Sequence, residues 1–250
     1  MNMAVTAEYV ASRTVGAAIV TAISDGSGRS SILGSLPVPR EVWRREVDAD
    51  EQDEIALGYN VVHVRLGATA ILIDLGFDEP SPTSPWRAPR HQRTPGGAAH
   101  AALGARPEET THVSRYPNAP SFLGHADWEG NAERDRPGSL LTRHHGPVAD
   151  AGRLALVDTE RAIVPGVTML AAPGESPGHC IVRGASEGAT FSFPSDLFHH
   201  PCEVQHRDWA SSGRDAAAPP AEALLVTTHM PFPAFGRLRE TPDGVAWVPA

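Results

Sequence analysis

Cysteine is scarce in this sequence, which has only two, Cys180 and Cys202, among its 250 residues. No Cys-x-x-Cys pair occurs, and this excludes a zinc knuckle built on paired cysteines. A disulfide between the two thiols has nothing in the sequence to support it. We therefore expect two free, buried thiols, as in proteins of reducing compartments.

An excess of positive charge is also lacking, because the formal net charge at pH 7 is −9. An acidic surface repels the phosphate backbone of nucleic acids and the headgroups of anionic lipids. We therefore expect the protein to bind neither nucleic acid nor a membrane surface. The oligomeric state has no signature in the sequence.

Long apolar runs are missing as well, because no apolar run in the sequence is long enough to span a bilayer. Residues 15–23 follow Arg13 and are similar to the apolar region of a signal peptide, but they end in the turn signal Ser24-Asp25-Gly26 instead of a cleavage site. Their β-branched residues favour a first strand. We expect a cytoplasmic protein.

Turn formers and short strand-like segments are abundant, with 23 glycines and 23 prolines. A chain of this length can bury one large core, and the excess of strands over helices favours an α+β or layered β architecture over a doubly wound one. The expected strands are residues 17–24, 60–66, 68–74, 110–113, 121–124, 154–157, 167–172, 180–183, 190–193 and 223–228; the expected helices are 98–103 and two segments of 127–151 separated at Pro137-Gly138, and 80–95 is expected to be a loop.

Three polar residues, His179, Asp196 and His229, each stand just beyond a predicted strand in the C-terminal half. Strand ends at one edge of a sheet converge, so such side chains can meet on a rigid frame. Two imidazoles and a carboxylate are suitable ligands for zinc or iron. Alternatively, the histidines are surface residues and Asp196 caps a short helix.

Four segments resemble metallo-β-lactamase-fold hydrolases, and they occur in the family's order. The segments are GYNVVHVRLGATAILIDLGF (58–77), APGESPGHC (172–180), FPSDLFHHP (193–201) and TTHMPFP (227–233). In the first segment, Asp74 and Gly76 match the Asp-x-Gly that ends a strand beside the metal cleft in the family. In the third segment, Ser195 stands where the family commonly has a glycine.

This resemblance implies an α+β fold, the αββα four-layer sandwich, formed as a single domain by residues 1–250. It implies His179, Asp196 and His229 as metal ligands, with Asp196 bridging two ions and Asp74 orienting the cluster, so Asp74 and Asp196 are the catalytic carboxylates. One or two zinc ions are expected, with iron or manganese as alternatives. A metal-bound water would then hydrolyse a small-molecule ester or lactone. Residues 122–129 and 196–201 resemble lactonase-like members.

The family's His-x-His-x-Asp-His motif is absent from the sequence. Residues 107–113 resemble the strand that precedes this motif, and residues 114–128 resemble what normally follows it. The simplest interpretation is an internal deletion near 113–116, with a second one near 218–222. The remaining residues offer two ligands per ion, and zinc would bind weakly because a catalytic zinc normally has three protein ligands.

The sequence assigns no other histidine to the role of a missing ligand, and whether one of them replaces it stays open. His199 and His200 follow Asp196 closely and are expected to contact the ligands instead of the metal. Exposed positions on a helix are expected for His144 and His145. Structural or surface roles are expected for His63, His91, His100 and His206. The position of His112, on the strand before the gap, is not a ligand position in the family. His125 has the spacing of a fragment of the motif (Gly124-His125-Ala126-Asp127) but falls in the later segment.

The sequence also raises two other functions, a serine hydrolase and a non-catalytic protein. Residues 174–178 (GESPG) match the nucleophile elbow of serine hydrolases, but Pro177 lacks the N–H that an oxyanion hole needs after the serine, so this activity is disfavoured. The missing metal motif favours the other alternative, a non-catalytic binding or scaffold protein or the product of a damaged gene. A lost helix would also bare part of a sheet and lower the stability.

Overall fold

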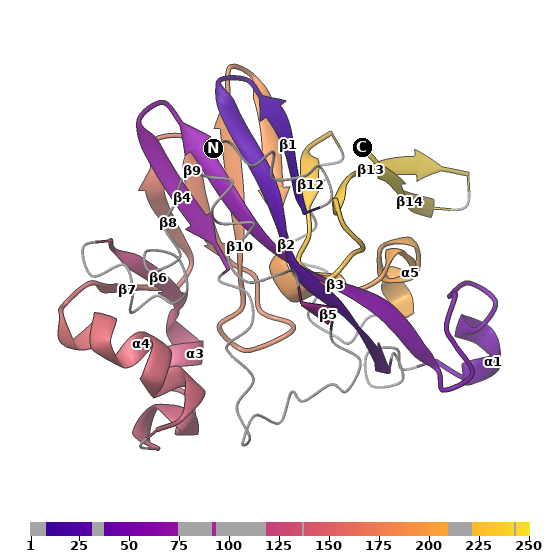
Figure 1. The fold of residues 1–250 in the computed structure, drawn as a ribbon, viewed down its shortest axis with the longest axis horizontal. Coiled ribbons are helices and arrows are strands. Elements are labelled where there is room, and N and C mark those ends of the chain that lie inside the picture. The colour runs from indigo at the N-terminus through magenta and orange to yellow at the C-terminus, as the bar shows by residue number, and fades with distance from the viewer. Residues whose placement is uncertain are drawn as a thin grey trace, which may run out of the picture.

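Short apolar strands assemble into two large β-sheets, which lie together in the centre of the molecule with helices to either side (Figure 1). The computed structural model describes residues 9–31, 38–74, 92–93, 119–136, 138–209, 222–242 and 244–250. In these residues one sheet has five strands, the second has seven, and a small third sheet has two.

The five-stranded sheet is built from two antiparallel hairpins in the order β1-β2-β3-β4. The hairpin predicted around Gly67 is confirmed. The strand predicted to stop at Ser24 continues instead to Ser31, because the chain absorbs a register shift between Ser24 and Gly26, where the glycine has φ 132°. The strands are β1 (Val10–Val15), β2 (Ala18–Ser31), β3 (Glu54–Leu66) and β4 (Thr69–Ile73), and β5 (Gln92–Arg93), inside the predicted loop, pairs with β2.

The seven-stranded sheet contains the C-terminal half of the chain in the order β14-β13-β12-β11-β10-β9-β8. The β11–β12 pair is parallel and the other pairs are antiparallel. Four of its strands were predicted, and β8, β13 and β14 were not. The strands are β8 (Glu160–Val164), β9 (Val167–Ala171), β10 (Cys180–Ser186), β11 (Ala189–Phe193), β12 (Leu224–Val226), β13 (Phe235–Thr241) and β14 (Gly244–Pro249).

The main core lies between these two sheets. Val20, Val62 and Val64 of the five-stranded sheet belong to the same buried cluster as Phe191 and Phe193 of the seven-stranded sheet. Val62 and Val64 are two residues apart, as are Phe191 and Phe193, so each pair points to one face of its strand. Burying a side chain of this kind stabilises the fold by about 1.5–3 kcal/mol.

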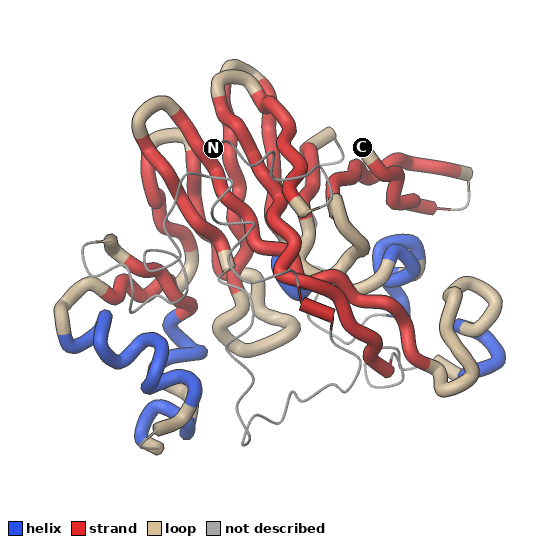
Figure 2. Tube along the Cα trace, viewed as in Figure 1, coloured by secondary structure: helices blue, strands red, loops and turns tan. Residues whose placement is uncertain are grey.

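A smaller helical part covers residues 119–158 and lies at the lower left of Figure 2. Its helices end at Asp135 and begin again at Leu140, which agrees with the predicted division, whereas the predicted exposure of His144 and His145 is wrong because both are partly buried. Because α4 packs against β7, His145 is half-buried, and burial followed by the charge of His144 lowers its pKa to about 4. The elements are β6 (Ser121–Gly124), α3 (His125–Glu129), η3 (Ala132–Asp135), α4 (Leu140–Asp150) and β7 (Leu154–Val157), with β6 and β7 parallel.

Short helices complete the described chain: α1 (Arg40–Trp43), η4 (Ser195–Leu197), α5 (Pro201–Gln205) and η5 (Arg207–Trp209). Trp43 and Cys202 share a buried cluster beside the core. Both cysteines are free, as predicted. The N-terminus of α5 is closed by a capping box, in which Glu203 accepts hydrogen bonds from the backbone N–H groups of His199 at 2.5 Å and His200 at 3.0 Å.

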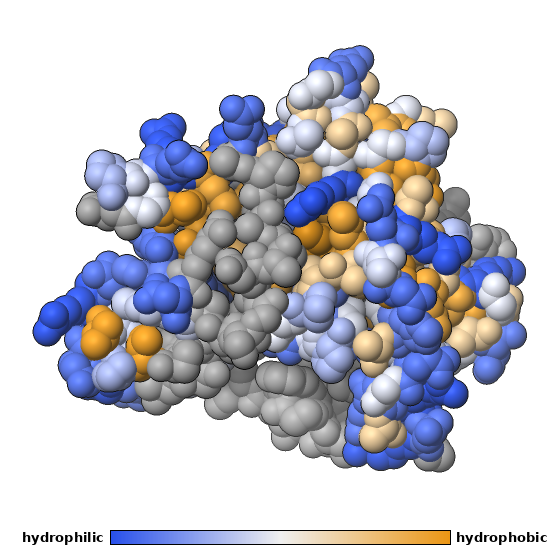
Figure 3. Space-filling view, turned by 180° about the vertical axis from the view of Figure 1, so that it is seen from behind, coloured by the Kyte–Doolittle hydropathy of each residue, from blue (hydrophilic) through white to orange (hydrophobic). Residues whose placement is uncertain are grey.

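Seen from behind, apolar residues reach the surface in patches among hydrophilic ones (Figure 3). Most of these side chains are only partly exposed, and among the described residues Val42 is the large apolar side chain classed as exposed, at 38%. Within the described ranges, no helix has the length and apolar character needed to cross a membrane. The segments predicted at 98–103 and 110–113, the deletion near 113–116 and all but the last residue of 218–222 lie outside these ranges.

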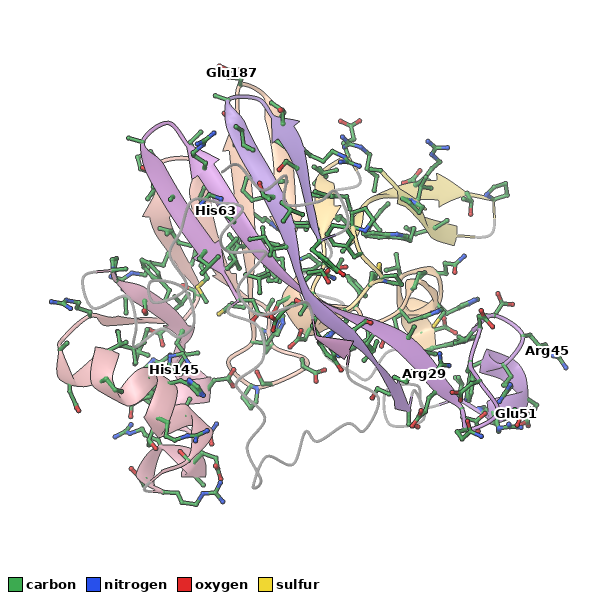
Figure 4. All side chains as sticks on the ribbon, in the orientation of Figure 1. Arg29, Arg45, Glu51, His63, His145 and Glu187 are labelled. Carbon is green, nitrogen blue, oxygen red and sulfur yellow. The ribbon has the colours of Figure 1, made fainter. Side chains whose placement is uncertain are left out.

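Replacing Glu203 by alanine should lower the free energy of unfolding by about 2–4 kcal/mol, because two backbone N–H groups lose their acceptor at a fully buried position. Urea denaturation followed by circular dichroism measures this. The matched control is Glu51→Ala at an exposed position on the right of Figure 4, where a change within about 0.5 kcal/mol is expected. Equal effects of the two substitutions would contradict the role assigned to Glu203.

Candidate metal centre

His179 lies in the loop between β9 and β10, and its ring has a fixed orientation. Its Nδ1 lies 2.9 Å from the carbonyl oxygen of Ala172, while the backbone N–H of Ala172 donates to the carbonyl of His179 at 2.7 Å. A carbonyl only accepts, so Nδ1 carries the proton and Nε2 keeps its lone pair. This Nε2 is buried and has no hydrogen-bond partner. A buried lone pair of this kind suits a cation.

His229 lies in the loop after β12 and is held in the same way. Its Nδ1 lies 3.1 Å from the carbonyl oxygen of Gly58, and its Nε2 lies 3.1 Å from Oδ1 of Asp196. Burial lowers the pKa of His229, but the contacts with Asp196 and Gly58 outweigh it, so the pKa is raised overall. A metal ion at Nε2 would compete with the proton that otherwise pairs with Asp196.

Asp196 contacts His229 and lies within the electrostatic influence of His199 and His179. Burial raises the pKa of its carboxyl, but the contact with His229 and the charges of His229, His199 and His179 lower it overall. The residue lies inside η4, whose N-cap is Pro194, so the alternative role of Asp196 as a helix N-cap is wrong. The preceding Ser195 has φ 50°, a backbone conformation that favours glycine.

Aromatic contacts enclose the His229 ring. The ring of His199 stacks on it with centroids 4.9 Å apart and planes 12° apart, and the ring of Tyr59 meets it edge-on at 5.8 Å. His199 therefore contacts a candidate ligand, as predicted. His200 does not share this role, because its Nδ1 accepts the N–H of Cys202 at 3.1 Å and caps α5.

Asn60, on β3, fixes the backbone on both sides of His229 and was missed in the sequence. Its buried Nδ2 donates to the carbonyls of Thr228 at 2.8 Å and Met230 at 2.9 Å. Beside it, the N–H of Gly58 donates to the carbonyl of His229 at 2.8 Å. The available signal was a polar amide directly before the apolar pair Val61-Val62, because a buried amide needs a hydrogen-bond partner.

Asp74 directly follows β4 at an exposed position with φ 63°, and its charge contributes to the raised pKa of His229. Asp74 therefore lies in the electrostatic surroundings of one candidate ligand, His229. Its predicted role in orienting a metal cluster stays a prediction.

The remaining histidines of the described chain have other surroundings. His206 stacks on Trp209 with centroids 3.9 Å apart, and His125 pairs with Asp158. His63 lies on β3, where burial and then the charge of Arg65 lower its pKa. The positions of His91, His100 and His112 lie outside the described residues.

The donors fit a divalent metal in type and tautomer, since two imidazole Nε2 atoms and a carboxylate oxygen are ordinary zinc ligands. They do not complete a site, because within the described ranges no group of three or more His, Cys, Asp or Glu side chains is close enough to hold one ion. His229 and Asp196 are the pair in direct contact. A bound ion would need further donors beyond this pair.

Comparison with known proteins gives matches among solved structures. No protein-family model matches the chain, and no curated protein matches its sequence. AidC, a dizinc quorum-quenching lactonase, is 17% identical with a TM-score of 0.66, covering 97% of both chains. A probable metal-dependent hydrolase from Staphylococcus aureus is 14% identical with a TM-score of 0.76, covering 95% of this chain and 99% of that one. AbOPH, a hydrolase of the beta lactamase superfamily, is 17% identical with a TM-score of 0.75, covering 98% of both.

Identities of this size establish architecture and leave activity to be argued from the site. The matches extend over nearly the whole chain, and they agree with the α+β class predicted from the sequence. The protein has the metallo-β-lactamase fold.

Proposed function

We propose that the protein is a metal-dependent hydrolase, zinc being the favoured metal and iron or manganese the alternatives. The observation that carries this proposal is the shared orientation of two histidines. His179 and His229 each donate from Nδ1 to a backbone carbonyl, which leaves Nε2 of His179 without a partner and Nε2 of His229 facing Asp196. Asp196 lies against one of these rings and within the electrostatic reach of the other. Metal-binding histidines in proteins are commonly oriented by such outer contacts.

His179, Asp196 and His229 would each contribute a donor, a bound ion would need further donors beside them, and Asp196 would be shared if two ions bind. A bound zinc ion supplies a Lewis acid and lowers the pKa of a coordinated water toward neutrality. The chain's own contribution is orientation and charge. The contact with His229 lowers the pKa of the Asp196 carboxyl, so this residue would supply a carboxylate both as a donor to the metal and as an acceptor for protons. His199 and Tyr59 shield the His229 ring from solvent.

The substrate class that we propose is a small ester or lactone. AidC is described in complex with the product N-hexnoyl-L-homoserine, and an AiiA variant from B. thuringiensis, with a TM-score of 0.55, is described with N-decanoyl-L-homoserine at its active site. Both molecules are opened acyl lactones. The acidic charge of this chain agrees with a small-molecule substrate in preference to nucleic acid.

A non-catalytic binding or scaffold role is the second candidate. It is favoured by the incomplete ligand set, since the described residues hold no group of three donors close enough for one ion. Metal binding and turnover by the purified protein separate the two candidates.

Replacing a candidate ligand should weaken zinc binding. We expect His179→Ala and His229→Ala each to lower the affinity for Zn²⁺ by at least roughly 100-fold, because each substitution removes a direct donor. Competition with a chromophoric chelator measures the affinity. His63→Ala is the matched control, since it removes a half-buried histidine from β3, labelled in Figure 4, and should leave the affinity unchanged. Wild-type protein with less than roughly a tenth of an equivalent of zinc would sink the proposal.

Hydrolysis should depend on the metal and on Asp196. We expect zinc-loaded protein to open a short-chain N-acyl lactone, with activity lost after chelation and restored by Zn²⁺. Asp196→Asn should lower kcat/KM by roughly 100-fold, because the amide binds metal poorly and takes up no proton. Asp135→Asn, at a side chain that is 88% exposed, is the control and should retain full activity. Absence of turnover in a protein that binds zinc would favour the non-catalytic alternative.

A further inference from the structure

The loop that carries His179 is held from outside by one acidic side chain. Asp127 of α3 accepts a hydrogen bond from the hydroxyl of Ser176 at 2.6 Å and another from the backbone N–H of Gly178 at 2.8 Å. Each carboxylate oxygen takes one of these bonds. A carboxylate that accepts two hydrogen bonds from adjacent points of a loop holds that loop firmly, since bonds to a charged group are the stronger kind.

The backbones of the helix and the loop also touch. A Cβ atom at Gly124, the N-cap of α3, would lie 1.7 Å from the carbonyl oxygen of Gly178. A Cβ atom at Gly178 would lie 2.3 Å from the backbone nitrogen of Asp127. Neither position has room for a side chain, so two glycines allow the approach that brings Asp127 into reach of the loop.

Inside the loop, Ser176 is bonded to His179. The backbone carbonyl of Ser176 accepts the N–H of His179 at 3.3 Å and that of Gly174 at 3.2 Å. The backbone of His179 in turn pairs with Ala172, whose carbonyl also fixes the imidazole. A displacement of Ser176 or Gly178 would therefore move the ring of His179.

We propose that Asp127 is a positioning residue for His179. By holding Ser176 and Gly178, it keeps the loop in the shape in which the carbonyl of Ala172 accepts from Nδ1 of His179 and Nε2 is left without a partner. This inference rests on the proposed function, because it assumes that His179 holds a metal. It also gives the serine of the Gly-x-Ser-x-Gly match a role: Ser176 donates its hydroxyl hydrogen to Asp127 and does not serve as a nucleophile.

The arrangement couples the helical part of the molecule to the metal centre. Asp127 belongs to α3 of the helical part, whereas His179 lies in the loop that joins β9 and β10 of the seven-stranded sheet. Figure 2 shows α3 beside the tan loop that follows β9. The position of this helix therefore determines the geometry of a candidate ligand.

The test compares four variants by zinc affinity. Asp127→Ala should weaken Zn²⁺ binding by roughly 10–100-fold, the usual loss when a residue that orients a ligand is removed. Ser176→Ala should cause a smaller loss, since Gly178 keeps its bond. Asp127→Asn should restore binding to near the wild-type value, because its amide can accept from Gly178 and donate to Ser176 Oγ. Asp135→Ala removes an equal charge from exposed η3 and should have no effect.

A second measurement separates this inference from the proposed function. Long-range ¹H–¹⁵N NMR of the metal-free protein reports the tautomer of His179, which should be fixed with the proton on Nδ1 in the wild type and Asp127→Asn. In Asp127→Ala, or in Ser176→Ala if the first variant does not fold, the two tautomers should mix. An unchanged His179 tautomer and unchanged zinc affinity in a folded Asp127→Ala protein would overturn the inference. Failure of the wild type to bind zinc, with the tautomer still dependent on Asp127, would instead overturn the metal assignment.

Discussion

Burial of two sheet faces against each other is the constraint on which the rest of this structure depends. Val20, Val62 and Val64 from one sheet and Phe191 and Phe193 from the other fill the space between them. Asp196 and His229 follow β11 and β12 of the second sheet, His179 lies in the loop between β9 and β10, and the ring of His229 is held by Gly58 of β3 in the first sheet. The packed sheets therefore set the geometry of the site without contributing a reacting group.

The polar groups at this edge have little freedom. Asn60 binds the carbonyls on both sides of His229, and Gly58 accepts from the ring itself. Asp127 performs a comparable task for the loop of His179 from the other side. In each case a buried or partly buried side chain satisfies backbone groups that would otherwise lose their water, and the imidazole orientation follows from it. The two candidate ligands are therefore oriented by different parts of the chain.

Several features of the site could be predicted from the sequence, because they depend on residues that are close together in the chain. A histidine, an aspartate and a second histidine placed just after predicted strands pointed to a shared edge, and His229 and Asp196 do meet there. The Gly67 hairpin and four strands of the larger sheet were also recognisable, since apolar alternation and turn residues act within a few positions. The unpaired thiols and the α+β class belong to the same group of predictions.

Other features were set by partners far away in the chain. The bulge that extends β2 past Ser24 and the half-buried position of His145 both depend on pairing or packing that local propensity does not describe. The sequence by itself determined the residue types available for a metal, two imidazoles and a carboxylate. Only the tertiary structure decided which ring nitrogen faces the site, because the carbonyls of Ala172 and Gly58 come into reach only when the strands have packed.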